Sequence, residues 1–261
     1  MPFTFSHPAA AVPLRRWLGR YGVLSALVIG SITPDLPYFF SNRLPGKASH
    51  SFSGLFWFCL PVGLIVYAFF HAILKRPLIT LLPEGLRERI TATTRPTAAR
   101  PPNWIGVAIS LVAGAATHDL WDAFTHFDGF VVLAIPLLQT VLFSVDNYHV
   151  RVYTLLQHGS TVAGLALLAF WFRQWAATGS AAPISPRAAK SPWRWRTAFI
   201  VAAASISLIV GAWIGALSIG ERAGTAALKV FLRRASISGS ITLALALVVY
   251  SAGWHLQRRR E

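Results

Sequence analysis

Long apolar segments alternate with shorter polar, basic segments along most of the 261-residue chain. About six apolar segments approach or reach the roughly 20 residues with which a helix crosses a bilayer. A seventh apolar stretch, 129–144, is shorter and carries Pro136, so we expect it to re-enter the membrane or to lie at its surface. The pattern predicts an all-α, polytopic transmembrane helix bundle with spans near 21–40, 52–73, 104–123, 154–172, 197–219 and 236–255.

The polar segments between these spans predict how the chain is organised. We expect residues 1–261 to form a single integral-membrane domain, with polar linkers near 75–103 and 178–193. The first of these linkers should hold a short surface helix around Leu86–Ile90. Proline interrupts a helix because it lacks an N–H donor, so the first span should break near Pro34 and Pro37.

Composition supports a membrane protein over a soluble one. Hydrophobic residues make up 54% of the chain and charged residues 13%, about half the usual share for a soluble domain. A net charge of +15 would indicate nucleic acid in a soluble protein. Here the basic residues cluster between apolar segments, as the positive-inside rule expects. We therefore expect the lipid bilayer as a partner, and no nucleic acid.

Charge also predicts an orientation. If 129–144 does not cross, most of the 24 basic residues fall on the side that holds both chain ends. That side is then cytoplasmic. All five aspartates fall on the outer side, together with five of the eight histidines. This convergence predicts a polar site at the outer membrane face. His7 falls on the inner side unless residues 1–12 fold back into the bundle.

The most unusual polar residues are His118, Asp122 and His126, which follow the apolar stretch of the third span. Their spacing of four places them on one helix face. Eight residues of helix rise about 12 Å, so one zinc with bonds of about 2 Å cannot take both histidines from an unbroken helix. Asp122 could instead bridge two metal ions about 3.5–4 Å apart. A buried hydrogen-bonded network is the alternative.

Three further residues are candidate ligands at the same membrane depth. Asp35 follows Pro34 at the end of the first span, and His50 enters the second. His158 lies one turn inside the fourth crossing segment. Each has a plain structural alternative: a turn residue for Asp35, a ring among lipid headgroups for His50 and a hydrogen bond between helices for His158. No phosphate-binding Gly-Lys-Ser/Thr loop, Gly-x-Ser-x-Gly elbow or His-Glu-x-x-His helix is present.

Four motifs in order carry a resemblance that covers nearly the whole chain: Met1 to Ala10, Gly30 to Phe39, His50 to Phe56 and His118 to His126. They resemble an uncharacterised family of bacterial multi-pass membrane proteins, domain of unknown function 4184, which implies a bacterial cytoplasmic membrane. The charge argument places both termini on its cytoplasmic side. A looser similarity is to membrane-bound predicted metal-dependent hydrolases, and it implies Asp35, His50, His118 and Asp122 as ligands.

These observations lead to two hypotheses. The first is a membrane-embedded hydrolase that acts on a lipid or phosphoester, with a divalent metal, zinc by expectation, and Asp119 or Asp128 as the catalytic base. The second is a non-enzymatic membrane protein in which the same residues form a transport or proton path or a structural polar network. The candidate metal ligands are Asp35, His50, His118, Asp122, His126 and His158.

Overall fold

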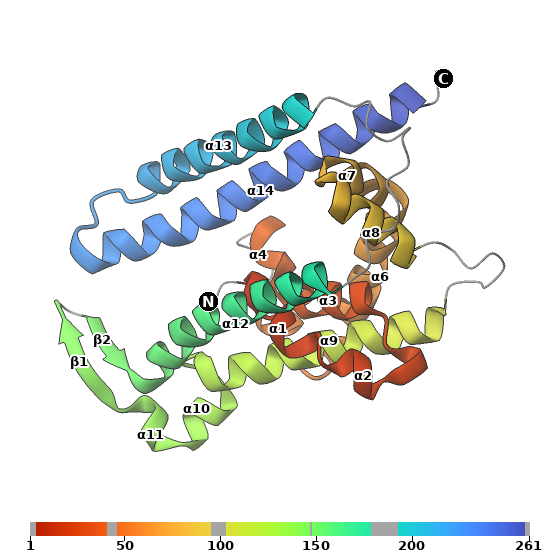
Figure 1. The fold of residues 1–261 in the computed structure, drawn as a ribbon. Coiled ribbons are helices and arrows are strands. Elements are labelled where there is room, and N and C mark those ends of the chain that lie inside the picture. The colour runs from red at the N-terminus through yellow and green to blue at the C-terminus, as the bar shows by residue number, and fades with distance from the viewer. Residues whose placement is uncertain (1–3, 41–45, 95–102, 147, 179–192, 259–261) are drawn as a thin grey trace. The chain divides into compact units, whose positions relative to one another are not determined.

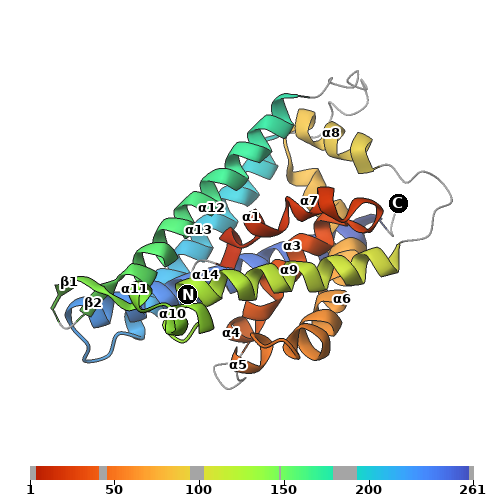
Figure 2. The same cartoon turned by 90° about the horizontal axis from the view of Figure 1, so that it is seen from below.

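The computed structural model describes residues 4–40, 46–94, 103–146, 148–178 and 193–258, and these residues are mostly helical (Figures 1 and 2). The chain divides into two compact units. The first comprises residues 1–68 and 102–174, and the second comprises residues 69–101 and 175–261. The prediction of a single integral-membrane domain stays a prediction.

The first unit carries every residue of the predicted polar site. Short helical turns alternate in it with longer helices, and one β-hairpin precedes its last helix. Its elements are the 3₁₀ turns η1 (Thr4–Ser6), η2 (Gly19–Tyr21) and η3 (Thr33–Asp35), the π-helical turn η4 (Leu55–Cys59), the helices α1 (Pro8–Ala11), α2 (Leu14–Trp17), α3 (Leu24–Ile32), α4 (Leu36–Phe40), α5 (Gly46–Ser49), α6 (Leu60–Phe69), α9 (Trp104–Thr125), α10 (Phe130–Ala134), α11 (Pro136–Gln139) and α12 (Val152–Ala177), and the strands β1 (Val141–Val145) and β2 (Tyr148–Arg151).

Helices α3 and α9 lie side by side and run in the same direction (Figures 1 and 2). Asn103 starts α9 by accepting a hydrogen bond from the backbone N–H of Gly106 at 3.0 Å, as an N-cap residue does. Small residues then let the two backbones touch. A Cβ atom added at Gly114 would overlap the carbonyl oxygen of Leu27, and one added at Gly30 would overlap that of Leu111.

The N-terminal segment folds back along this helix pair. Helix α1 contacts both α3 and α9, and the Thr4 hydroxyl donates to the Asp35 carboxylate at 2.6 Å. Asp35 lies just after the end of α3, so Thr4 lies at that end and not where α3 begins. Residues 4–11 therefore fold back, which is the condition under which the charge pattern does not place His7 on the inner side. Thr4 contacts Asp35, so this segment and the site lie on the same side of the membrane. A cytoplasmic N-terminal segment and a site at the outer face therefore cannot both be correct.

The apolar stretch after α9 forms no membrane-spanning helix. It consists of α10, α11 and strand β1, which pairs antiparallel with β2. Each element is shorter than a bilayer crossing requires. The expectation of an all-α chain is wrong here, because Val141–Val145 is rich in β-branched and apolar residues that favour a strand. Asp146 has a φ of 52° in the turn that follows, a conformation that Asp tolerates.

The second unit is built around two long helices. Helices α13 and α14 lie side by side along most of α13 (Figure 1). Gly211 and Gly239 lie at a close approach of the two backbones. The expected surface helix around Leu86–Ile90 is present as part of α8. The elements of this unit are the π-helical turn η5 (Phe70–Leu74) and the helices α7 (Lys75–Leu81), α8 (Glu84–Thr94), α13 (Trp193–Leu217) and α14 (Gly224–Arg258).

Four helical segments of the described residues are long and apolar enough to cross a membrane, which suggests an integral membrane protein. They match four of the six predicted spans. Leu24–Phe40 is a shorter apolar helix interrupted at η3, as its prolines predict. Helix α9 is not among the four, because its last turns carry ionisable residues that lower its hydropathy. The four segments are Leu55–Leu81, Val152–Ala177, Arg194–Leu217 and Gly224–Arg258.

The predicted linkers are only partly described. The stretch 75–103 is largely helical, as α7 and α8, and its remainder at 95–102 lies outside the described residues. The second linker, 178–193, lies almost entirely outside them.

The close contact between α3 and α9 can be tested at one glycine. We expect Gly114→Ala to lower the free energy of unfolding by about 1–3 kcal/mol, because the added methyl group overpacks the contact with Leu27. Gly159→Ala in α12 is the matched control, since a Cβ there meets nothing within 4 Å. It should leave stability unchanged or raise it by up to about 1 kcal/mol. Denaturant unfolding of the full chain in detergent measures both, and equal effects would contradict the close contact.

Candidate metal centre

Four segments of the first unit bring polar side chains to one place. Asp35 ends η3, and His50 follows α5. His118 and Asp122 lie one turn apart near the end of α9. Because α3 and α9 run in the same direction, their ends meet, and Asp35 reaches the two α9 residues. His7 arrives from the N-terminal segment between η1 and α1.

Asp35, His50, His118 and Asp122 form a group that could hold a metal ion. One ligand atom from each lies within 4.8 Å of every other. The His50 Nε2 atom is 3.4 Å from Asp35 Oδ1 and 3.7 Å from Asp122 Oδ2. The His118 Nε2 atom is 3.6 Å and 3.3 Å from the same two oxygens. Ligands at bonds of about 2.0 Å around a tetrahedral ion are roughly 3.3 Å apart, so the spacing fits one ion.

A hydrogen bond to the backbone fixes which ring nitrogen of His118 faces the carboxylates. Its Nδ1 atom lies 2.7 Å from the backbone carbonyl oxygen of Ser31. A carbonyl can only accept, so Nδ1 carries the proton. The ring is fully buried, and its Nε2 atom has no hydrogen-bond partner. Nε2 therefore holds either a second proton or a metal ion between the two carboxylates. A backbone carbonyl that orients a ligating imidazole in this way is typical of metal sites.

His50 is oriented in the same way through a serine. The Ser49 hydroxyl donates its one hydrogen to the carbonyl oxygen of Pro34 at 2.8 Å. It also lies 3.2 Å from His50 Nδ1, so at that contact the hydroxyl oxygen accepts and Nδ1 is the donor. This directs the His50 Nε2 atom at Asp35 and Asp122, where it holds either a second proton or a metal ion. Ser49 also joins the turn that carries Asp35 to the segment that carries His50.

The two carboxylates have different surroundings. The Asp35 side chain is 2% exposed, and the buried Thr4 hydroxyl holds its second oxygen. Asp122 is 13% exposed and presents one oxygen to each side of the cluster. Its Oδ2 atom faces His50 and His118, and its Oδ1 atom lies 3.6 Å from His7 Nε2 and 3.3 Å from His126 Nδ1. Asp122 is thus placed as a bridge, and the two-metal interpretation stays a prediction.

His7 is the residue of this cluster that sequence reasoning did not assign. Its ring stacks on that of His118, with centroids 3.8 Å apart. Burial, followed by the neighbouring His118, lowers the pKa of His7 to about 3, so the ring is neutral near pH 7. The sequence did contain evidence for His7, since Thr4 and His7 both belong to the first of the four motifs. Charge counting alone separated this segment from the other site residues unless residues 1–12 fold back.

Several buried polar atoms at this place lack hydrogen-bond partners. Buried polar groups are nearly always paired, so a cluster of exceptions indicates a bound ion or water. The donor set consists of imidazole nitrogens and carboxylate oxygens, which suits zinc or manganese. The residues therefore fit a divalent metal. The unpaired atoms are His7 Nδ1 and Nε2, His118 Nε2, Asp119 Oδ1, Asp122 Oδ1 and His126 Nδ1.

The other predicted site residues lie around or outside this group. His126 follows the last residue of α9 and contacts Asp122. His158 is exposed on α12, and the structure does not bring it into the group. Asp119 is half-buried beside His118, and Asp128 is exposed in the turn after α9. The catalytic roles of Asp119 and Asp128 stay predictions.

Comparison with known proteins places the chain in a family. Residues 1–252 match the model of the domain of unknown function DUF4184, so the chain belongs to this family. No curated protein and no solved structure matches the chain. The match confirms the family resemblance read from the four motifs, and it assigns no activity to the site.

Proposed function

We propose that the chain is a membrane-embedded, metal-dependent hydrolase whose site lies at the outer membrane face and acts on a lipid or another phosphoester. One observation carries the proposal. The Nε2 atoms of His50 and His118 both face the carboxylates of Asp35 and Asp122. Imidazole nitrogens that face two carboxylates require positive charge between them, supplied by ring protons or by a metal ion, and the near-tetrahedral spacing of the four atoms favours a metal ion.

The four side chains would act together as ligands. Asp35 and His118 are the most buried, and Thr4 and the Ser31 carbonyl hold their outer atoms. Such outer hydrogen bonds fix ligand orientation and raise ligand basicity. A bound divalent ion supplies a Lewis acid for a phosphoryl oxygen and makes water a nucleophile near pH 7. Zinc is the expected ion, with manganese as the alternative.

Solvent reaches the group from one side. His50 is 18% exposed and Asp122 is 13% exposed, whereas Asp35 and His118 are closed off. A substrate would therefore approach at the edge between His50 and Asp122. Asp119 follows His118 on α9, and one of its oxygens is buried without a partner. A carboxylate in this position can accept a proton from water, so we assign Asp119 the role of base ahead of the exposed Asp128.

A second candidate function is a non-enzymatic one. Four protein ligands fill a tetrahedral shell, which is the arrangement of structural zinc sites. In that case the same residues would form a structural metal site, or a polar network with His118 doubly protonated. An open coordination position separates the two functions, since a hydrolase needs one for water or substrate.

Metal content tests the ligand assignment. We expect about one zinc or manganese ion per chain in the detergent-purified protein, prepared without chelator and analysed by elemental mass spectrometry. His118→Ala and Asp122→Ala should each lose the ion, because each removes a ligand from a four-residue set. His149→Ala is the matched control, since this exposed histidine bonds Ser144 in the hairpin and should not affect the metal.

The same measurement tests the bridging role of Asp122. A content of two ions that falls to one in His126→Ala would establish a two-metal site. Folded wild-type protein that binds no metal after metal is resupplied would exclude the proposed hydrolase.

Turnover tests the reaction class. We expect metal-loaded protein to hydrolyse a chromogenic phosphodiester or a vesicle phospholipid. Asp119→Asn should keep its metal and lose about 10²-fold or more in kcat, because the variant cannot accept a proton. Asp146→Asn is the control, since this aspartate lies in the hairpin turn and Asn tolerates the same backbone conformation. A loss in Asp128→Asn instead would move the role of base to Asp128. Metal-loaded protein without activity on any ester would favour the non-enzymatic function.

A further inference from the structure

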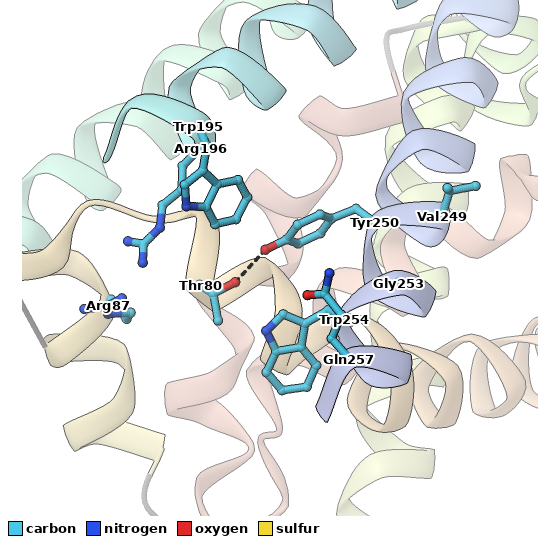
Figure 3. A pocket seen from close by; sticks show the side chains of 9 residues that line it. All are labelled: Thr80, Arg87, Trp195, Arg196, Val249, Tyr250, Gly253, Trp254 and Gln257. Carbon is cyan, nitrogen blue, oxygen red and sulfur yellow. Dashed lines mark hydrogen bonds between the residues drawn. The ribbon is translucent and has the colours of Figure 1, made fainter. Parts of the chain in front are cut away.

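The second unit contains a cavity of about 590 Å³. Its lining comes from α7, α8, α13 and α14 (Figure 3). The volume is in the range of pockets that hold a small ligand. The lining includes two arginines, three aromatic residues and no carboxylate: Thr80, Arg87, Trp195, Arg196, Val249, Tyr250, Gly253, Trp254 and Gln257.

Arg196 is the unusual residue of this cavity. It is only 6% exposed, and its Nε atom has no hydrogen-bond partner. A buried guanidinium is costly unless an anion pairs with it, yet no acidic side chain of the described residues forms an ion pair with Arg196. Its guanidinium lies over the ring of Trp195, whose centroid is 5.8 Å away.

A second guanidinium belongs to the same cavity. In Figure 3 the Arg196 side chain extends toward Arg87 on α8. Arg87 has a partner in Glu84, three residues earlier on α8, at 3.6 Å. That one contact leaves most of the five N–H donors of Arg87 available. Two guanidinium groups that share a cavity without a lining carboxylate favour a ligand with several anionic oxygens.

The cavity lies where membrane-spanning helices end. Thr80 is next to the end of the segment Leu55–Leu81, and Arg196 is close to the start of Arg194–Leu217. Trp254 is near the end of Gly224–Arg258, and the Arg258 guanidinium lies 4.5 Å from its ring centroid. Helix ends with Trp, Tyr and Arg side chains lie at the depth of lipid headgroups. The Tyr250 hydroxyl bonds Thr80 at 2.8 Å and fixes α14 on α7 inside the cavity.

We propose that this cavity binds the phosphate group of an anionic glycerophospholipid, with Arg196 and Arg87 as its ligands. Arginine binds phosphate through two parallel N–H donors, and basic pockets between membrane helices bind anionic headgroups. A lipid is favoured over a soluble phosphate because the lining residues lie at the ends of spanning helices. The site is distinct from the metal centre and does not depend on the proposed hydrolase activity.

Lipid titration of the full-length protein in detergent tests this proposal. We expect phosphatidylglycerol to bind about tenfold more tightly than zwitterionic phosphatidylcholine, as measured by native mass spectrometry. Arg196→Gln should weaken phosphatidylglycerol binding about tenfold, since it removes the charged donors. Arg16→Gln is the matched control: it removes one positive charge from an exposed residue outside the cavity and should leave binding unchanged.

Two further variants keep the test decisive. Arg196→Lys retains the charge without the planar fork and should give intermediate binding. Arg87→Gln should also weaken binding about tenfold, and it carries the test if Arg196→Gln does not fold. Equal binding of the two lipids, or wild-type binding in the folded Arg196→Gln or Arg87→Gln variant, would overturn the proposal.

Competition with inorganic phosphate shows whether the cavity binds a lipid headgroup or free phosphate. At matched ionic strength, excess inorganic phosphate should leave phosphatidylglycerol binding unchanged, because the acyl chains of the lipid add contacts that free phosphate lacks. The lipid assignment would be overturned if the wild-type protein bound inorganic phosphate but not the lipid, and if Arg196→Gln abolished the binding of phosphate.

Discussion

The close packing of α3 against α9 is the constraint on which the metal centre depends. Gly30 and Gly114 bring the two backbones into contact, so the helices keep one register along their length. In that register Ser31 lies beside His118, and the turn after α3 brings Asp35 to Asp122. Larger residues at either glycine would separate the helix ends, and the carboxylates would no longer share the two histidines.

The remaining parts of the site are oriented by uncharged groups. Ser49 aligns the ring of His50, Thr4 holds Asp35, and a backbone carbonyl aligns His118. Each of these partners turns the inward atom of its neighbour toward the centre of the cluster, where imidazole nitrogens lie 3.3–3.7 Å from carboxylate oxygens. The orientation of the side chains is therefore the main physical reason to expect a cation at this place.

The sequence predicted the parts of the molecule that follow from local pattern. Apolar length identified four spans, Pro34 marked the break in the first helix, and the spacing of His118 and Asp122 placed them on one face. Asp35 and His50 were expected at the same depth, and their convergence with the α9 residues is confirmed.

Long-range contacts were not predictable in the same way. The return of residues 4–11 to α9 depends on packing that charge counting ignores, so His7 was not assigned. The hairpin at Val141–Arg151 was missed because a short apolar run has no period that separates a strand from a membrane segment. Arg196 lies just before the predicted span 197–219, and only the structure shows that it is buried.

X-ray absorption at the zinc edge tests the central claim most directly, because it reports the atoms around the ion. We expect the four side-chain ligands and one water at about 2.0–2.2 Å from the ion, with two imidazoles among them and one imidazole lost in His50→Ala. A shell without imidazole, or one that His50→Ala leaves unchanged, would contradict a metal centre formed by Asp35, His50, His118 and Asp122.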